Sequence, residues 1–398
     1  MRAPMMSIHT VAAGGGSILH FDGARYRVGP DSAGANPGPA SYRRGGPLAV
    51  TDANVMLGKI QPQFFPPVFG PGGDERLDAG VVRGKFAELA GKIRAATGDA
   101  RSPEEVAEGF VNIAVGNMAN AIKHISVQRG HDVTGYTLCC FGGAAGQHAC
   151  LVADALAMTR VFIHPFAGVL SAYGMGLADQ TAMRQKAVEA RLDEAGRASM
   201  EGELQGLADE AKGELLGQGV EPSRIRVLRR VHLKYEGTDT ALAVAFGTLA
   251  EMVARFEEAY RHQYSFLMPG KALIVEAVSA EAIGASETVA DAGAATAMAE
   301  APPAEQVRMF TGGRWHDTPV YRRDELGAGR LVDGPAIIAE SNATTVVEPG
   351  WRAQVTPADH LVLERVVARE ARVALGTDAD PVMLEIFNNL YMSIAEQM

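Results

Sequence analysis

The chain has 398 residues, of which 47% are hydrophobic and 21% charged, and its formal net charge is -10. This length accommodates two or three domains with sizeable cores. The acidic balance argues against a general nucleic-acid surface, which needs clustered Lys and Arg. No apolar run approaches the ~20 residues that cross a bilayer. The composition therefore favours a protein that acts on small molecules, without nucleic-acid or membrane partners.

Cysteine usage points to a reducing compartment. Cys139, Cys140 and Cys150 are too few and too poorly spaced for a disulfide framework, and no CxxC pair suggests a thiolate zinc site. The N-terminal sequence MRAPMMSIHTVAAGGG has no sustained apolar region of the signal-peptide type. We therefore expect a cytoplasmic protein.

The first half of the chain combines loops with one strong helix. Residues 1 to about 72 are rich in Gly, Pro, Asn and Ser, which predicts ordered loops on a scaffold. Ser102, Pro103 and Glu105 form a capping box with Pro at the first helical position. Apolar residues then recur at three- to five-residue steps, which predicts a helix to about Gln128.

A βαβ passage follows. TLCCF (137–141) predicts a strand, QHACLVADALAM a helix and RVFIHP a second strand, so a parallel sheet is expected. Residues 186–223 are charged and rich in Ala and Leu, which favours helix, and RVLRRVHLKYEG and ALAVAF are typical of paired strands. Residues 285–305 predict an exposed loop. Short strands at regular spacing beyond it indicate a small β-rich region.

A glycine run, Gly14, Gly15 and Gly16 with Ser17, is the first candidate binding loop. Glycines permit positive φ and let backbone N–H groups converge on a phosphate or carboxylate. A tight turn between strands explains the same residues equally well. The glycines alone leave both interpretations open.

A second candidate loop, FGGAAGQH, contains Gly142, Gly143, Gly146 and Gln147 between the predicted strand and helix. Ligands of open α/β sheets bind at this end of the strands, so the position suits a nucleotide. Neither the G-x-G-x-x-G nor the G-x-x-x-x-G-K-[ST] pattern occurs in the chain. Close packing of small residues between helix and sheet is the structural alternative.

Polar residues elsewhere offer weaker candidates. Asp52 and Asn54 could bind metal or substrate, but capping of the following helix is the simpler interpretation. His131, Asp132 and His148 are conceivable metal ligands, although no H-E-x-x-H spacing fixes two of them on one face. Serine-hydrolase chemistry lacks its G-x-S-x-G motif.

Long stretches resemble a known family. SIHTVAAGGGSI, RVGPDSAGANPGPASYRRGGPLAVTDANVMLGK, ISVQRG, FGGAAGQHAC and HPFAGVLSAYGMGLAD are similar to the hydantoinase A portion of the hydantoinase/oxoprolinase family. LKYEGTDTAL and YSFLMPGKALIVEAV look more like 5-oxoprolinases than like N-methylhydantoinases or ATP-dependent carboxylases, which remain alternatives.

The resemblance implies an α/β fold class: part of an actin-like ATPase/sugar-kinase fold over residues 1–185, then an α+β and β-rich region over 186–376. It implies ATP between two lobes, with Gly142 to Gln147 on the adenosine side. The AAGGGSI loop, Asp52 and Asn54 would lie near phosphate or substrate, which makes the latter two the candidate catalytic residues. The implied reaction is ATP- and Mg²⁺-dependent hydrolysis of 5-oxo-L-proline, or a similar cyclic amide, to L-glutamate. Phosphorylation of the amide oxygen makes that oxygen a leaving group.

Departures from the family pattern affect the expected partners. Phosphate-binding segments of the D-V-G-G-T-F-T-D type normally precede AAGGGSI, and residues 377–398 resemble the opening of the hydantoinase B portion. Ala145 also stands where the family usually has Gly. We therefore expect activity only together with an N-terminal phosphate-binding segment and a hydantoinase B portion, and a homo-oligomeric assembly. The alternative is an inactive or assembly-only fragment.

Overall fold

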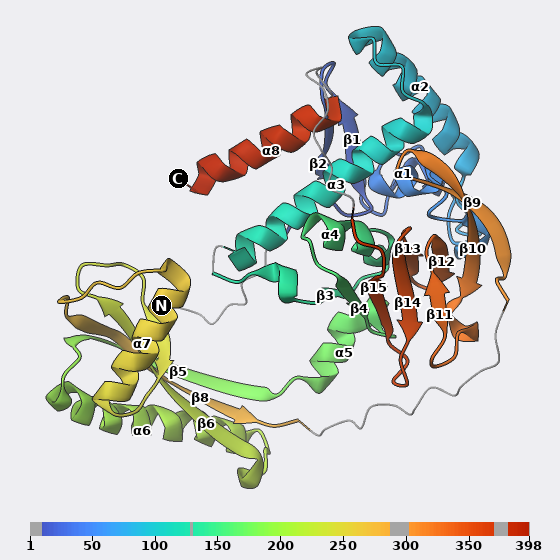
Figure 1. Ribbon diagram of the computed structural model, residues 1–398. Helices are drawn as coiled ribbons and strands as arrows, with labels where there is room; N and C mark the ends of the chain where they lie inside the picture. Colours follow the sequence, from blue (N-terminus) through green and yellow to red (C-terminus); the bar gives the residue numbers. More distant parts are fainter. Residues whose placement is uncertain (1–9, 128–129, 287–301, 370–380, 398) are drawn as a thin grey trace. The chain divides into compact units, whose positions relative to one another are not determined.

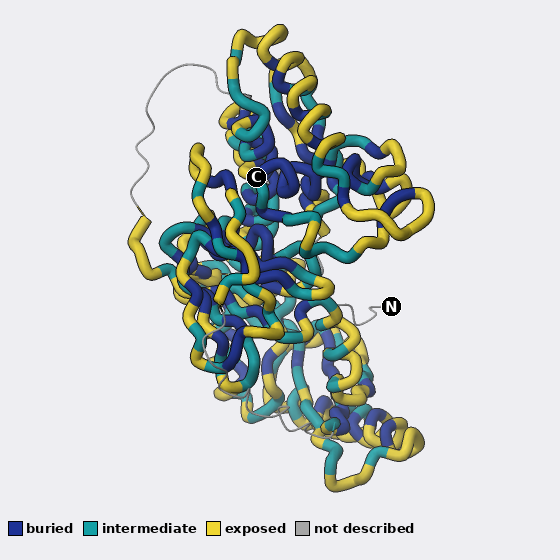
Figure 2. Tube along the Cα trace, turned by 90° about the vertical axis from the view of Figure 1, so that its right-hand side faces the viewer, coloured by how far each residue is buried: buried dark blue, intermediate teal, exposed yellow. Residues whose placement is uncertain are grey.

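The computed structural model describes four stretches of the chain, which form two compact units (Figure 1). The smaller unit contains residues 130–131 and 171–286. The larger unit contains residues 10–127, 132–170, 302–369 and 381–397. Buried positions run through the interior of each unit, and exposed positions follow loops and outer helix faces (Figure 2). No helix within these stretches combines the length and apolarity needed to cross a membrane.

The smaller unit is a four-stranded antiparallel sheet with two long helices. The strand order is β5 (Gln180–Arg191), β8 (Leu273–Gly284), β6 (Ile225–Tyr235) and β7 (Leu242–Ala245). Helices α6 (Glu194–Gly217) and α7 (Leu249–Tyr264) share one apolar core with the sheet, including Leu204, Phe256 and Val231. α5 (Leu170–Leu177) precedes β5. The predicted pairing of the β6 and β7 segments is confirmed.

The helix predicted from residue 186 begins later than expected. Residues 186–191 belong to β5, which pairs with β8 across a bulge between Ala187 and Ala190. β5 is an edge strand with mostly exposed side chains, four of which are charged: Arg184, Lys186, Glu189 and Arg191. Charges are common on edge strands because they discourage pairing with other chains. The helix prediction was wrong here because such a strand has the composition of a solvated helix.

In the larger unit the predicted βαβ passage is confirmed. β3 (Leu138–Cys140) and β4 (Arg160–Ile163) are parallel, and α4 (Ala149–Ala155) lies between them in sequence. The sheet continues through β15 (Leu361–Arg365), β14 (Trp351–Val355) and β11 (Leu331–Asp333), all paired antiparallel. Of the strands predicted near the C-terminus, only LVLERV, which forms β15, joins the sheet that β3 and β4 begin.

A second sheet and a hairpin belong to the same unit. The second sheet has the order β13 (Thr344–Val347), β12 (Ala336–Ala339), β10 (Arg314–Arg322) and β9 (Glu305–Thr311). β1 (Ser17–Phe21) and β2 (Tyr26–Ser32) form the hairpin. The C-terminal strands thus belong to the same compact unit as residues 10–127 and 132–170. Most of the loop predicted at 285–305 lies outside the described residues.

Four helices complete the larger unit: α1 (Val50–Met56), α2 (Ala79–Thr97), α3 (Pro103–Ser126) and α8 (Pro381–Gln397). The predicted capping box of α3 is present, because Ser102 Oγ accepts the Glu105 N–H and Glu105 accepts the Ser102 N–H. Phe110 of α3 stacks on Tyr26 of β2, with ring centroids 4.7 Å apart. α3 therefore joins the hairpin, the other helices and the sheets into one core.

Candidate functional site

The two glycine-containing loops lie against each other at the start of α1. The Thr51 N–H donates to the Gly15 carbonyl at 2.8 Å. A Cβ placed on Gly15 would lie 2.7 Å from Thr51 Oγ1 and 3.8 Å from the Ala144 Cβ. Residues 14–17, the first turn of α1 and residues 142–147 therefore form one site, although the two glycine loops are about 130 positions apart in sequence.

Only some of the predicted glycines face open space. A Cβ added to Gly14 or to Gly142 would meet no atom within 4 Å, whereas one on Gly16 would approach Ser32 Oγ to 3.0 Å. Gly142 has a φ of 94°, a conformation that residues with side chains rarely adopt. Ser17 is buried and begins β1. Of the predicted glycines, Gly14 and Gly142 are thus the two with open space where a side chain would lie.

The other two glycines of the second loop serve packing. A Cβ on Gly143 would lie 2.5 Å from the Asn342 carbonyl oxygen, and one on Gly146 would lie 2.8 Å from the Thr344 carbonyl oxygen. The connection between β12 and β13 therefore covers this loop directly. Sequence analysis did not predict that contact, because nothing in the sequence SNAT (341–344) indicates the segment against which it packs. Gly143 and Gly146 therefore pack against the backbone of Asn342 and Thr344, and their predicted role in nucleotide binding stays a prediction.

Asn54 holds the second loop from α1. Its amide nitrogen donates to Gln147 Oε1 at 2.8 Å and lies 3.1 Å from His148 Nε2. Burial, and next the nearby Lys59 ammonium, lower the pKa of His148 from 6.5 to about 3. The imidazole is therefore neutral at physiological pH. Asn54 is fully buried, so its surroundings give it a positioning role.

Asp52 is buried and organises the backbone on the opposite side of α1. Its carboxylate accepts the N–H groups of Ala40, Ser41 and Ala49, each at 2.9 Å. Burial raises its pKa, and the hydrogen bonds from Ser41, Ala49 and Ala40 oppose that rise. Both Asp52 and Asn54 lie inside α1 and not ahead of it; Asp52 accepts the N–H of Ala49, the residue that precedes the helix, from the first helical turn.

The three candidate metal ligands each have a different local environment. Asp132 accepts the Thr134 N–H and hydroxyl, at 3.0 and 2.7 Å, and these bonds lower its pKa. The His131 ring lies 5.2 Å from the His262 ring in the smaller unit. His148 faces Asn54. Across the described stretches no group of three or more His, Cys, Asp or Glu side chains could hold a metal ion. The proposed His/Asp/His set is therefore not assembled.

A buried ion pair that sequence analysis missed adjoins the site. Lys59 Nζ lies 2.5 Å from Glu348 Oε1, and both side chains are nearly inaccessible. Thr311 Oγ1 donates to Glu348 Oε2 at 2.8 Å. Lys59 follows α1 and Glu348 follows β13, so the pair joins the α1 region to the strands that cover the 142–147 loop.

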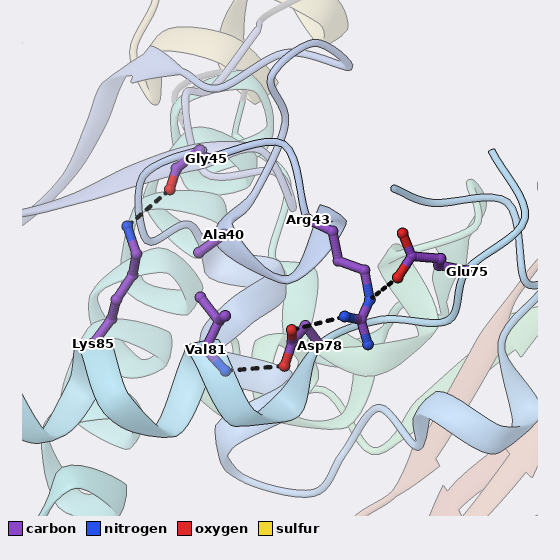
Figure 3. A pocket seen from close by; sticks show the side chains of 8 residues that line it. Ala40, Arg43, Gly45, Glu75, Asp78, Val81 and Lys85 are labelled. Carbon is purple, nitrogen blue, oxygen red and sulfur yellow. Dashed lines mark hydrogen bonds and ion pairs between the residues drawn. The ribbon is translucent and has the colours of Figure 1, made fainter. Parts of the chain in front are cut away.

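A polar surface pocket of about 370 Å³ lies at the N-terminal end of α2 (Figure 3). Arg43 bridges Asp78 at 2.9 Å and Glu75 at 3.4 Å. Lys85 Nζ donates to the Gly46 carbonyl at 3.0 Å. The positive charges of Arg43 and Lys85 thus balance the two carboxylates, so the formal charges of the pocket lining sum to zero.

Comparison with known proteins identifies the family. The model described as hydantoinase/oxoprolinase matches residues 1–184, and the hydantoinase/oxoprolinase C-terminal domain matches residues 186–364. The chain is 37% identical to 5-oxoprolinase 1 of Arabidopsis thaliana over 409 residues, which is 100% of this chain and 32% of the relative. It thus spans about a third of that relative's length.

A caprolactamase gives the structural counterpart. The chain is 29% identical to caprolactamase subunit alpha of Pseudomonas jessenii, over 89% of this chain and 52% of the subunit. A crystal structure of the ATP-dependent caprolactamase from the same organism superposes with a TM-score of 0.78 and 29% identity, over 91% of this chain and 53% of that one. This likeness confirms the expected fold class. The chain belongs to the hydantoinase/oxoprolinase family and represents its hydantoinase A portion.

Proposed function

We propose that the chain is the hydantoinase A component of an ATP-dependent 5-oxoprolinase, which hydrolyses 5-oxo-L-proline to L-glutamate while ATP is cleaved to ADP and phosphate. The observation that carries the proposal is the meeting of the two glycine loops at α1, through Gly15, Thr51 and Ala144, with open space beside Gly14 and beside Gly142. The 5-oxoprolinase relative and the ATP-dependent caprolactamase support a cyclic amide as substrate.

The residues of the chain suit a nucleotide. Open backbone at Gly14 and Gly142 lets phosphate or ribose oxygens approach without meeting a side chain. Asn54 positions the 142–147 loop through Gln147, and neutral His148 adds no charge beneath it. Phosphorylation of the lactam oxygen by ATP then activates the ring carbon toward water; the C–N bond breaks with the amine as leaving group, and phosphate departs from the acyl phosphate when it is hydrolysed. Asp52 and Asn54 act in this scheme by placing backbone, not by touching the substrate.

The described residues do not suit a resident metal, because none of them form a group of three or more ligands. We therefore assign no step to a protein-held ion. Mg²⁺ would arrive with the phosphates of ATP, which is common in enzymes that bind the ion through one or two protein groups and the nucleotide.

The proposed reaction requires additional polypeptide. About two thirds of the 5-oxoprolinase relative lies outside the stretch that the chain matches, and the caprolactamase relative is named as one subunit. We infer that a hydantoinase B polypeptide and the family's N-terminal phosphate-binding segment act with this chain. Its three free cysteines suit a cytoplasmic location.

The test is ADP release coupled to glutamate formation from 5-oxoproline and Mg-ATP. The chain is assayed alone and mixed with a hydantoinase B polypeptide and the phosphate-binding segment from the same organism. We expect coupled turnover only in the mixture. If the mixture neither turns over 5-oxoproline nor binds ATP, the chain is an assembly module and the proposal is wrong.

Gly14→Val tests the site itself. Its side chain enters open space without straining the fold, so we expect unchanged thermal stability and at least a tenfold higher KM for ATP. Gly91→Val on α2 is the matched control, because that glycine also has no atom within 4 Å of an added Cβ. Equal KM values for the two variants would show that the Gly14 loop does not border the nucleotide.

A further inference from the structure

The surface pocket at the N-terminal end of α2 contains charged groups whose hydrogen-bonding capacity the protein does not use up. Its volume of about 370 Å³ is at the small end of the range for ligand sites, which suits a small ligand. Arg43 and Lys85 reach the pocket from opposite sides, and Ala40 and Val81 supply apolar contact (Figure 3). The pocket thus combines two positive groups with an apolar wall.

Lys85 is a half-buried cation that forms no ion pair with any Asp or Glu of the described stretches. Its Nζ donates to the Gly46 carbonyl oxygen at 3.0 Å, whereas an ammonium has three N–H donors. A partly buried ammonium loses hydration, and an anion offsets that loss better than a neutral carbonyl does. Lys85 is therefore the first contact point for a negatively charged group of a ligand.

Arg43 keeps donors for the same ligand group. Its Nε donates to the Arg76 carbonyl oxygen at 2.7 Å and its Nη1 to Asp78 Oδ2 at 2.9 Å. Of its five N–H donors, the two on Nη2 form no hydrogen bond with the described residues. The φ of Arg43 is 63°, a conformation that residues with side chains rarely adopt, and the Ala40 N–H just before it bonds buried Asp52. The backbone that holds the guanidinium is thus fixed.

The two carboxylates of the pocket differ in what they can still accept. Asp78 caps α2, because its Oδ1 accepts two N–H groups of the first helical turn while its Oδ2 accepts from Arg43. Glu75 is 45% accessible, and its Oε2 lies 3.4 Å from Arg43 Nε. Glu75 is therefore the carboxylate with capacity for a positively charged group of a ligand.

We propose that this pocket binds a small zwitterion of the α-amino-acid class. The carboxylate of the ligand bonds Lys85 Nζ and Arg43 Nη2. Its ammonium bonds Glu75, and its aliphatic part lies against Val81. The formal charges of the lining sum to zero, so a zwitterion preserves the balance of charge that a simple anion or cation would upset. No residue of the two glycine loops lines the pocket, so this site is distinct from the candidate nucleotide site.

The experiment measures binding to the full chain without nucleotide, by saturation-transfer NMR and calorimetry at constant ionic strength. The probe is L-glutamate, and glutarate is the matched ligand that lacks only the amino group. The test variants are Glu75→Gln and Lys85→Met, of which the second removes the charge and keeps an unbranched side chain. Lys92→Met is the control, since Lys92 is exposed, lies seven residues further along α2 and does not line the pocket. Circular dichroism verifies that the variants remain folded.

We expect the wild-type chain to bind L-glutamate about fivefold more tightly than glutarate, because only L-glutamate uses Glu75. Lys85→Met should weaken L-glutamate binding about fivefold, and Lys92→Met by less than about twofold. Glu75→Gln should weaken the binding of L-glutamate and not that of glutarate.

Three outcomes overturn the proposal. The first is a wild-type chain that does not bind L-glutamate, a result that needs no variant. The second is glutarate bound as tightly as L-glutamate, which makes the pocket a simple anion site. The third is equal weakening in Lys85→Met and Lys92→Met, which assigns the binding to general surface charge. The proposed function is tested separately, because this binding requires neither ATP nor a further polypeptide.

Discussion

Two clusters in the larger unit contain the same kinds of charge in opposite environments. Lys59 and Glu348 pair beside the candidate site with 2% and 4% of their side chains accessible. Arg43 and Glu75 pair in the surface pocket with 33% and 45% accessible. Water screens the second pair and not the first. Two ion pairs of the same residue types therefore contribute differently to the free energy of unfolding.

The buried pair has a structural role because each charge offsets the lost hydration of the other. A lysine or glutamate taken out of water loses several kcal/mol of hydration, and only its partner and further hydrogen bonds offset that loss. Thr311 supplies one such bond to Glu348. The pair thus links the segment after α1 to the end of β13. The β12–β13 connection, which covers Gly143 and Gly146, belongs to the same part of the sheet.

The largest expected effect is on the buried pair. Glu348→Gln leaves the Lys59 ammonium buried without a carboxylate, so we expect the free energy of unfolding to fall by about 3–5 kcal/mol. Urea denaturation followed by circular dichroism measures it. The control is Lys59→Met/Glu348→Leu, which removes both charges and should recover most of the loss. A double variant as unstable as the single one contradicts this explanation.

Burial of His148 makes the stability of the larger unit depend on pH. Its pKa falls from 6.5 to about 3 on folding, so between these values the unfolded chain binds a proton that the folded chain does not. The contribution of this site to stability is therefore complete above pH 6.5 and declines as the pH falls toward 3, by about 1.4 kcal/mol per pH unit. Urea denaturation from pH 7 to pH 4 measures it, and His148→Gln should show a shallower acid dependence. Parallel profiles would place the acid sensitivity elsewhere.

Asp52 tests whether buried hydrogen bonds differ from exposed ones of the same kind. Asp52→Asn keeps the size but turns one acceptor into a donor that faces backbone N–H groups, so we expect a loss of about 1–3 kcal/mol and faster hydrogen exchange at Ala40 and Ser41. Asp22→Asn is the control, since Asp22 accepts the N–H groups of Ala24 and Arg25 on the surface. Its expected loss is below about 0.5 kcal/mol. Similar losses for the two variants would remove burial as the cause.

Local features of this fold were predictable, and distant pairings were not. The α3 capping box lies within four consecutive residues, and the β3–α4–β4 passage follows from hydrophobic patterning over about 25 residues. Lys59 and Glu348 are 289 positions apart, and nothing near either residue specifies the other. The helix prediction from residue 186 was also wrong, because the edge strand β5 has a composition typical of an exposed helix.

The candidate site shows the same division. The two glycine loops were recognisable from their residues, but their contact at Gly15, Thr51 and Ala144 depends on the tertiary fold. Which glycines face open space also depends on it, since Gly143 and Gly146 are covered by Asn342 and Thr344. Asp52 and Asn54 were selected as candidates from the sequence. The structure shows that both are buried, where Asp52 bonds the backbone near Ala40 and Asn54 bonds the 142–147 loop.

The smallest expected effect completes the comparison. Glu75→Gln is the same substitution as Glu348→Gln, at a half-exposed carboxylate whose partner Arg43 keeps Asp78 at 2.9 Å. We expect a loss below about 0.5 kcal/mol in urea denaturation, because exposed pairs contribute little and one carboxylate remains. The loss should vanish in 1 M salt, where the Debye length is about 3 Å, whereas the effect of Glu348→Gln should persist because salt does not reach a buried pair. A salt-independent loss of stability in Glu75→Gln, comparable to that in Glu348→Gln, would mean that burial does not cause the difference between the two clusters. The structural role of the Lys59–Glu348 pair would then depend on its contacts alone.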